Sequence, residues 1–142
     1  TEKRQIDKIK REKLKTKGQW TKEAQAAFNA YVRARDKHEG CISCGLHTAN
    51  NSSGGDWDCG HYRSTGSSPH LRFHLWNVQK QCKKCNRHLS GNVAQYRVDL
   101  IWKLGHEKVE ALECMNDPKN YSIEDLKRIK RIFTKRIKRY QK

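Results

Sequence analysis

Apolar residues recur every three or four positions in residues 21–40, and this spacing predicts a strong amphipathic helix. Thr21 is the predicted N-cap and Gly40 the predicted end of the helix. The stripe expected to face the core consists of Ala24, Ala27, Phe28, Tyr31 and Val32. Because this stripe lies on one side of the helix, its aromatic residues are interpreted as core and not as a platform for stacking bases.

The second half of the chain has three further helical patterns. One covers residues 92–104 and stops at Gly105, and a short one covers residues 106–115. After Pro118, Ser122 and Asp125 have the spacing of a capping box at the start of a last helix. That helix has an apolar stripe and an opposite face dense in lysine and arginine, which is either solvated or in contact with phosphates.

The segment between the two halves has a different character. Glycine, serine and asparagine crowd residues 45–60, which predicts a loop leading into a short strand. Residues 70–82 predict a second short extended segment, and a helix is expected to begin near Asn86 or shortly beyond it. The chain is therefore predicted to be mostly helical α+β, with a small core inserted between long flanking helices.

The net charge of the chain indicates which kind of partner it binds. The 142 residues have a formal net charge of +16 and only 35% hydrophobic residues. A field of this sign concentrates polyanions, which favours nucleic acid over an anionic membrane surface as the partner. Residues 1–19 are predicted to be a basic arm, either frayed helix or disordered, and residues 20–142 a single domain. No bilayer-length apolar run and no signal peptide are visible, so no membrane association and a cytoplasmic location are expected.

Four of the six cysteines form two C-x-x-C pairs, Cys41 with Cys44 and Cys82 with Cys85. Such turns present two thiolates to one tetrahedral ion, and two turns complete a closed four-sulfur shell. The pairs therefore predict a structural Zn²⁺ site. A redox role is the alternative, although neither pair opens a βαβ unit. Of the other two, Cys114 is expected in the core, and Cys59 as a packing residue or spare thiol.

The polar residues between and after the two C-x-x-C turns, the zinc knuckles, follow the order His61, Asn77, Asn86 and His88. Phosphodiester hydrolysis needs a base, for which neutral histidine is suited near pH 7, and a hard cation that stabilises developing charge. The order resembles HNH nucleases of the ββα-metal type with zinc knuckles. This resemblance implies His61 as general base, Asn77 as the residue that ties down the strand-connecting loop, and Asn86 as ligand of a catalytic Mg²⁺ or Mn²⁺.

One position departs from the HNH pattern. Many HNH enzymes have Asp or His directly before the base, whereas this chain has Gly60. Asp58 can replace the missing ligand if the strand bulges at Gly60, because alternation otherwise places residues 58 and 61 on opposite faces. His88 is the reserve ligand, and it can act together with Asn86 only if the helix has not yet begun at Asn86.

A wider resemblance covers roughly residues 20–140. The segments "DCGHYRSTGSSPHLRF", "KQCKKCNRHLSGN" and "AQAAFNAYVRARD" are similar to the NinG/Rap recombination proteins of lambdoid phages. The resemblance implies a metal-dependent endonuclease that cuts branched DNA, such as Holliday junctions and D-loops, in phage recombination. Symmetric cutting of a junction would need a homodimer. The alternatives are a non-catalytic zinc-containing DNA-binding module, an RNA-processing nuclease and, with less support, a transcription regulator.

Overall fold

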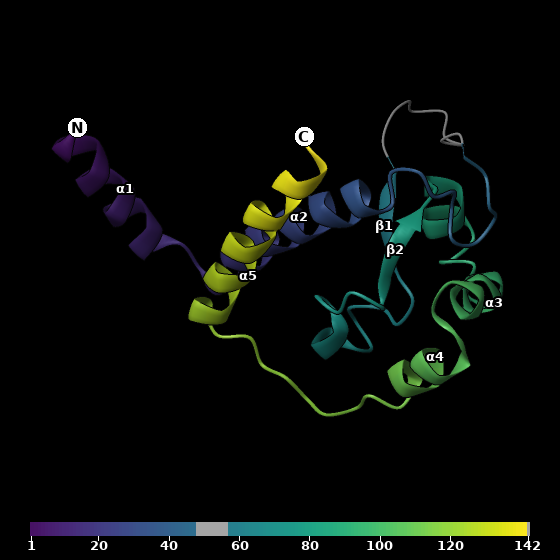
Figure 1. Ribbon diagram of the computed structural model, residues 1–142. Coiled ribbons are helices and arrows are strands. Elements are labelled where there is room, and N and C mark those ends of the chain that lie inside the picture. The colour runs from purple at the N-terminus through teal and green to yellow at the C-terminus, as the bar shows by residue number, and fades with distance from the viewer. Residues whose placement is uncertain (48–56, 142) are drawn as a thin grey trace.

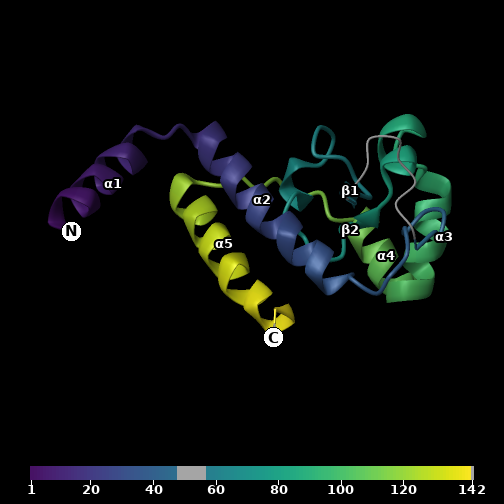
Figure 2. The same ribbon diagram turned by 90° about the horizontal axis from the view of Figure 1, so that it is seen from above.

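The computed structural model describes residues 1–47 and 57–141, so most of the loop predicted within residues 45–60 lies outside it. Two long helices, α2 and α5, lie side by side, with a two-stranded sheet beyond the C-terminal end of α2 (Figures 1 and 2). Helices α3 and α4 lie on the far side of the sheet, and α1 extends away from the body. The α-helices are α1 (Glu2–Leu14), α2 (Lys17–Arg35), α3 (Val93–Leu104), α4 (His106–Glu113) and α5 (Ile123–Arg136).

The N-cap of α2 is Thr16, and the prediction of Thr21 is wrong. The Thr16 hydroxyl accepts from the backbone N–H of Gln19 at 3.2 Å, and the Gln19 side chain accepts from the Thr16 N–H at 2.8 Å. This reciprocal box satisfies two N–H groups that have no partner within the helix. Thr21 lies inside the helix and donates its hydroxyl to the carbonyl of Lys17. The helix also ends at Arg35, before the predicted Gly40.

The predicted apolar stripe of α2 forms the main core with α5. Ala24, Phe28 and Val32 are fully buried, and Phe28 meets Phe133 of α5 edge to face at 4.8 Å between ring centroids. Such aromatic pairs stabilise beyond their buried area. The start of α5 confirms the predicted capping box, because Ser122 and Asp125 each accept from the other's backbone N–H.

The sheet consists of β1 (Asp58–His61) and β2 (Val78–Gln81), paired antiparallel with His61 opposite Val78. All four residues of β2 are buried, because α2 covers the sheet from one side and the second core covers it from the other. That second core joins residues of α3 and α4 to Ile42 and Leu71. The described residues also form short helical turns at Pro69–Leu71, Lys84–His88 and Ile137–Tyr140.

The two cysteines outside the knuckles have different environments. The Cys59 side chain packs against the main core and donates to the carbonyl of Asn29 at 3.3 Å, which confirms it as a packing residue. Burial raises the pKa of its thiol to about 11. Cys114 is exposed, so its predicted place in the core is wrong. It follows the last residue of α4, outside the stripe through which Val109 and Leu112 are buried.

Within residues 1–47 and 57–141, none of the helices combines the length and apolar character needed to cross a membrane.

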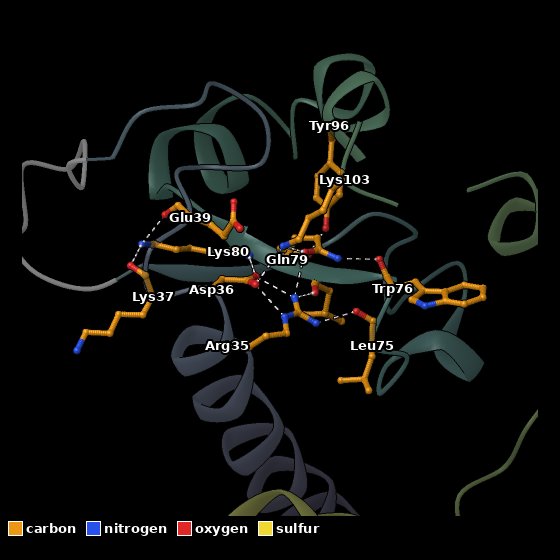
Figure 3. A network of polar contacts seen from close by, with 12 residues as sticks. Arg35, Asp36, Lys37, Glu39, Leu75, Trp76, Gln79, Lys80, Tyr96 and Lys103 are labelled. Carbon is orange, nitrogen blue, oxygen red and sulfur yellow. Dashed lines mark hydrogen bonds and ion pairs between the residues drawn. The ribbon is translucent and has the colours of Figure 1, made fainter. Parts of the chain in front are cut away.

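A buried carboxylate joins α2, the sheet and α3 (Figure 3). Asp36 is 1% exposed and accepts from Arg35 through both oxygens at 2.8 Å, from Lys103 at 3.0 Å and from the backbone N–H of Lys80 at 3.1 Å. Burial by itself would raise the pKa of Asp36, but the hydrogen bonds and charges of Arg35 and Lys103 outweigh it and hold this pKa below its ordinary value. The carboxylate is therefore ionised and fixes the end of α2 against β2.

We expect Asp36→Asn to destabilise the protein by about 3 kcal/mol, because it leaves two cations in this network without their counter-charge. The melting temperature at neutral pH should fall by about 10 °C. A carboxylate with a lowered pKa stabilises above the pKa of the unfolded chain, so the difference between wild type and variant should shrink below about pH 4. Thermal melts across pH test this, with the exposed carboxylate of Asp117 as control. Equal melting temperatures for Asp36→Asn and Asp117→Asn would contradict the assignment.

Candidate metal centre and adjacent histidine site

The two C-x-x-C turns meet at one point of the fold. The sulfur atoms of Cys41, Cys44, Cys82 and Cys85 all lie within 4.8 Å of one another. The Cys44 and Cys82 sulfurs are 3.8 Å apart. A tetrahedral zinc with bonds of about 2.3 Å requires sulfurs separated by about 3.8 Å. The donor set therefore fits Zn²⁺, and the predicted four-cysteine cluster is confirmed.

Backbone geometry prepares these sulfurs for a metal. The N–H of Cys82 points at the sulfur of Cys41 at 3.3 Å, and the N–H of Cys85 points at the sulfur of Cys82 at 3.4 Å. The side chain of Asn92 donates to the Cys85 sulfur at 3.6 Å. Donors of this kind stabilise thiolates and orient them as ligands. The first turn closes through Gly45, whose positive φ of 77° suits glycine.

His61 is the last residue of β1 and is half-buried. Its Nε2 lies 3.1 Å from the carbonyl oxygen of Arg72. A carbonyl only accepts, so Nε2 carries the hydrogen and Nδ1 keeps its lone pair. Burial lowers the pKa of His61, and the Arg72 carbonyl opposes this shift only in part. The imidazole is therefore neutral at pH 7, with Nδ1 as the basic nitrogen.

Asn77 is fully buried just before β2 and organises the loop that follows His61. Its Nδ2 donates to the carbonyls of Arg63 at 3.0 Å and Leu71 at 3.2 Å, while its Oδ1 accepts from the N–H of Arg63 at 2.8 Å. Its own carbonyl accepts from the N–H of Tyr62. These four bonds fix both ends of the connection between the strands.

Asp58 and Asn86 are brought together from β1 and the helical turn after the second knuckle. The Asn86 Nδ2 donates to Asp58 Oδ2 at 2.9 Å. Arg87 holds the same carboxylate through two bonds, 2.9 Å to Oδ2 and 3.0 Å to Oδ1. The carboxylate and amide oxygens suit a hard cation, but Asp58 would have to exchange its guanidinium partner for it.

The sequence analysis set one condition for Asp58 and another for His88 as metal ligands, and the structure meets neither. The register of β1 is regular from Asp58 to His61, so the bulge at Gly60 is absent. The helical turn begins at Lys84 and already includes Asn86, so Asn86 and His88 point in different directions. The His88 side chain is exposed.

The structure also explains Gly60. A Cβ at this position would lie 1.9 Å from the Gln81 side-chain oxygen. The other end of the Gln81 amide donates to Ser43 at 2.8 Å and to the Gly91 carbonyl at 2.7 Å. Gln81 thus joins the first knuckle, β2 and the turn before α3. Any side chain at position 60 would displace this link.

Sequence reasoning missed two residues that position the site. Tyr96, within the helix predicted over residues 92–104, donates its hydroxyl to the Gly60 carbonyl at 2.7 Å and so ties α3 to β1 beside His61. Arg63 donates to the carbonyls of Leu112 at 3.0 Å and Met115 at 2.7 Å, which fastens the segment after α4 to the same loop. The segment "DCGHYRSTGSSPHLRF" contains Arg63, but no sequence signal specified its partners about fifty residues away.

The fold and site define a mostly helical α+β protein with a two-stranded sheet and a four-cysteine cluster that could bind zinc. Residues 1–142 match the family described as bacteriophage lambda NinG protein, and the chain belongs to this family. Protein ninG of Escherichia phage lambda is 43% identical over 131 residues, covering 92% of this chain and 62% of that protein. Protein ninG of Salmonella phage P22 is 42% identical over the same length, again at 92% and 62%. The chain thus spans somewhat less than two thirds of these relatives. No solved structure matches it.

Proposed function

We propose that this chain is a metal-dependent DNA endonuclease of the HNH type that cuts branched recombination intermediates. The observation that carries the proposal is the state of His61: a neutral imidazole at the end of β1, with Nε2 committed to the Arg72 carbonyl and Nδ1 left as a base. The branched substrate rests on the resemblance to the NinG/Rap recombination proteins. The cytoplasm of the bacterial host is the corresponding location.

In this proposal, each residue has a separate task. His61 Nδ1 takes a proton from water as the water attacks phosphorus, and Asn77 holds the loop that orients the imidazole. Asn86 is the oxygen donor that would hold Mg²⁺ or Mn²⁺. Asp58 would join it only after leaving Arg87 and turning toward the face of His61, because β1 has no bulge at Gly60. His88 stays a reserve ligand only if the helical turn that includes Asn86 rearranges. The cation would stabilise charge on the phosphate and on the leaving 3′ oxygen. A homodimer would present two such sites to a four-way junction.

One observation favours a second candidate, a non-catalytic zinc-containing DNA-binding module. Arg87 binds both oxygens of the Asp58 carboxylate, which the catalytic cation would otherwise use. In this alternative the pair is permanent, and His61 serves only to hold the Arg72 carbonyl. The net charge of +16 fits either candidate.

A cleavage assay on an end-labelled four-way junction and its matching linear duplex decides between them. The protein keeps its zinc, and Mg²⁺ or Mn²⁺ is added to one set of reactions. We expect cuts in the junction that require the added cation and are much weaker in the linear duplex. Tight binding of the junction without cuts under either cation would support the binding module instead.

A further inference from the structure

A second basic feature lies outside the histidine site. An open groove of about 620 Å³ runs between α1 and α5 and is floored by Trp20 of α2. Six cationic side chains line it, against the single carboxylate of Glu12: Lys8, Lys127, Lys130, Arg131, Lys135 and Lys138. None of the residues discussed around His61 contributes to this lining.

Part of this charge serves the fold. Trp20 is 4% exposed, and the ammonium groups of Lys15, Lys127 and Lys130 lie 4.5, 5.2 and 5.5 Å from its ring centroid. Lys15 and Lys130 also share the carboxylate of Glu23, each at 3.0 Å. These contacts offset the mutual repulsion of cations around the floor of the groove.

The remaining cations have no such compensation. Within the described residues, Lys8, Arg131, Lys135 and Lys138 form no ion pair with an acidic group. Arg131, Lys135 and Lys138 lie at spacings of four and three along α5 and its last turn, so they share one face and repel one another. An anionic ligand in the groove would relieve this repulsion.

We propose that the groove between α1 and α5 binds the phosphate backbone of DNA and holds a duplex arm outside the site of chemistry. From Lys127 to Lys138 the row of cations is about 16 Å long at 1.5 Å per residue. Phosphates follow one another along each strand at about 3.4 Å of helix axis, so the row matches several phosphates and not a single ion. The Thr134 hydroxyl lies in the same lining and adds a donor of the kind that contacts phosphate.

The placement of α1 supports this assignment. This helix has no buried residue, and a helix of 13 residues is marginal by itself. It contributes Lys8 to one wall of the groove while α5 forms the other. A phosphate backbone between the two walls would neutralise cations of both and hold α1 against the body. The choice of DNA as ligand rests on the proposed function.

The test compares two variants with the same loss of charge. The groove variant carries Arg131→Gln, Lys135→Gln and Lys138→Gln. The control carries Lys22→Gln, Arg128→Gln and Arg139→Gln, at three exposed cations that do not line the groove. Fluorescence anisotropy measures the affinity of the full chain for a labelled junction over a range of salt concentrations. The plot of log affinity against log salt has a negative slope. We expect its magnitude to be smaller by about 3 in the groove variant than in the wild type. It should change by less than about 1 in the control.

Equal slopes for the two variants would overturn the groove assignment. So would unchanged DNA binding combined with lost binding to vesicles of phosphatidylglycerol, which would make the groove a membrane contact. Structured RNA that competes better than DNA of equal length for the wild type, but not for the groove variant, would overturn DNA as the ligand. Cleavage at saturating protein is measured separately. A wild type that binds the junction but never cuts it refutes the nuclease proposal, whereas the groove assignment is tested by the salt dependence of binding alone.

Discussion

We expect Cys82→Ser to abolish the four-sulfur site and to remove the cooperative thermal transition of the protein. The Cys82 sulfur accepts from the N–H of Cys85 in its own knuckle and lies 3.8 Å from the Cys44 sulfur of the other knuckle, so it contacts both. Zinc binding contributes on the order of 10 kcal/mol to the folding of small zinc domains. That is comparable to the whole stability of an ordinary domain. Without the metal, the link between the end of α2 and the start of α3 is lost.

The measurement is zinc content per chain together with the thermal transition. Wild type and Cys114→Ser should each bind one zinc and melt at the same temperature, because Cys114 is exposed and outside the cluster. Cys82→Ser should bind none, and chelation of the wild type should reproduce its behaviour. A Cys82→Ser protein that retains one zinc and the wild-type transition would refute the metal centre.

Under the proposed function, we expect His61→Ala to lower the rate of junction cleavage by about 10² to 10⁴, the usual contribution of a general base. Binding of the junction should change by less than about twofold, because phosphate contacts dominate affinity. The matched control is His106→Ala, at an exposed histidine on α4. His61→Asn checks for structural damage, since its amide can still donate to the Arg72 carbonyl. Both His61 variants should retain the wild-type thermal transition.

The pH profile provides an independent readout of His61. Burial lowers the pKa of this imidazole, so the neutral, basic form persists below the ordinary titration range of histidine. Cleavage by the wild type should therefore persist to lower pH than an ordinary histidine base would allow, and it should decline as the imidazole gains its proton. The residual activity of His61→Ala should lack this decline. A wild-type rate in the His61→Ala variant, at any pH, would reduce His61 to a structural role.

Local patterns in the sequence determined the elements of this protein. The capping box of Ser122 with Asp125 and the apolar stripe through Phe28 and Val32 are confirmed, because each depends on residues within a few positions of one another. The two C-x-x-C pairs predicted their common site for a related reason. Each pair forms its own turn, and two such turns complete a shell of four thiolates.

The error at the start of α2 was also local in origin. Thr16 and Thr21 both precede plausible helical residues, and only Thr16 has a glutamine three residues later to complete the box. The misplacement of Cys114 had a different cause. A cysteine is often buried, but here α4 ends one residue before it, after Val109 and Leu112 have filled the core.

Only the tertiary structure decided how the polar residues around His61 are partnered. Arg87 reaches Asp58 across 29 positions of the chain, Gln81 fills the space beside Gly60, and the Arg72 carbonyl selects the tautomer of His61. These contacts depend on strand register and on side chains from separate elements, for which residue spacing carries no signal. The sequence by itself determined which chemical groups are present, and packing determined which of them meet.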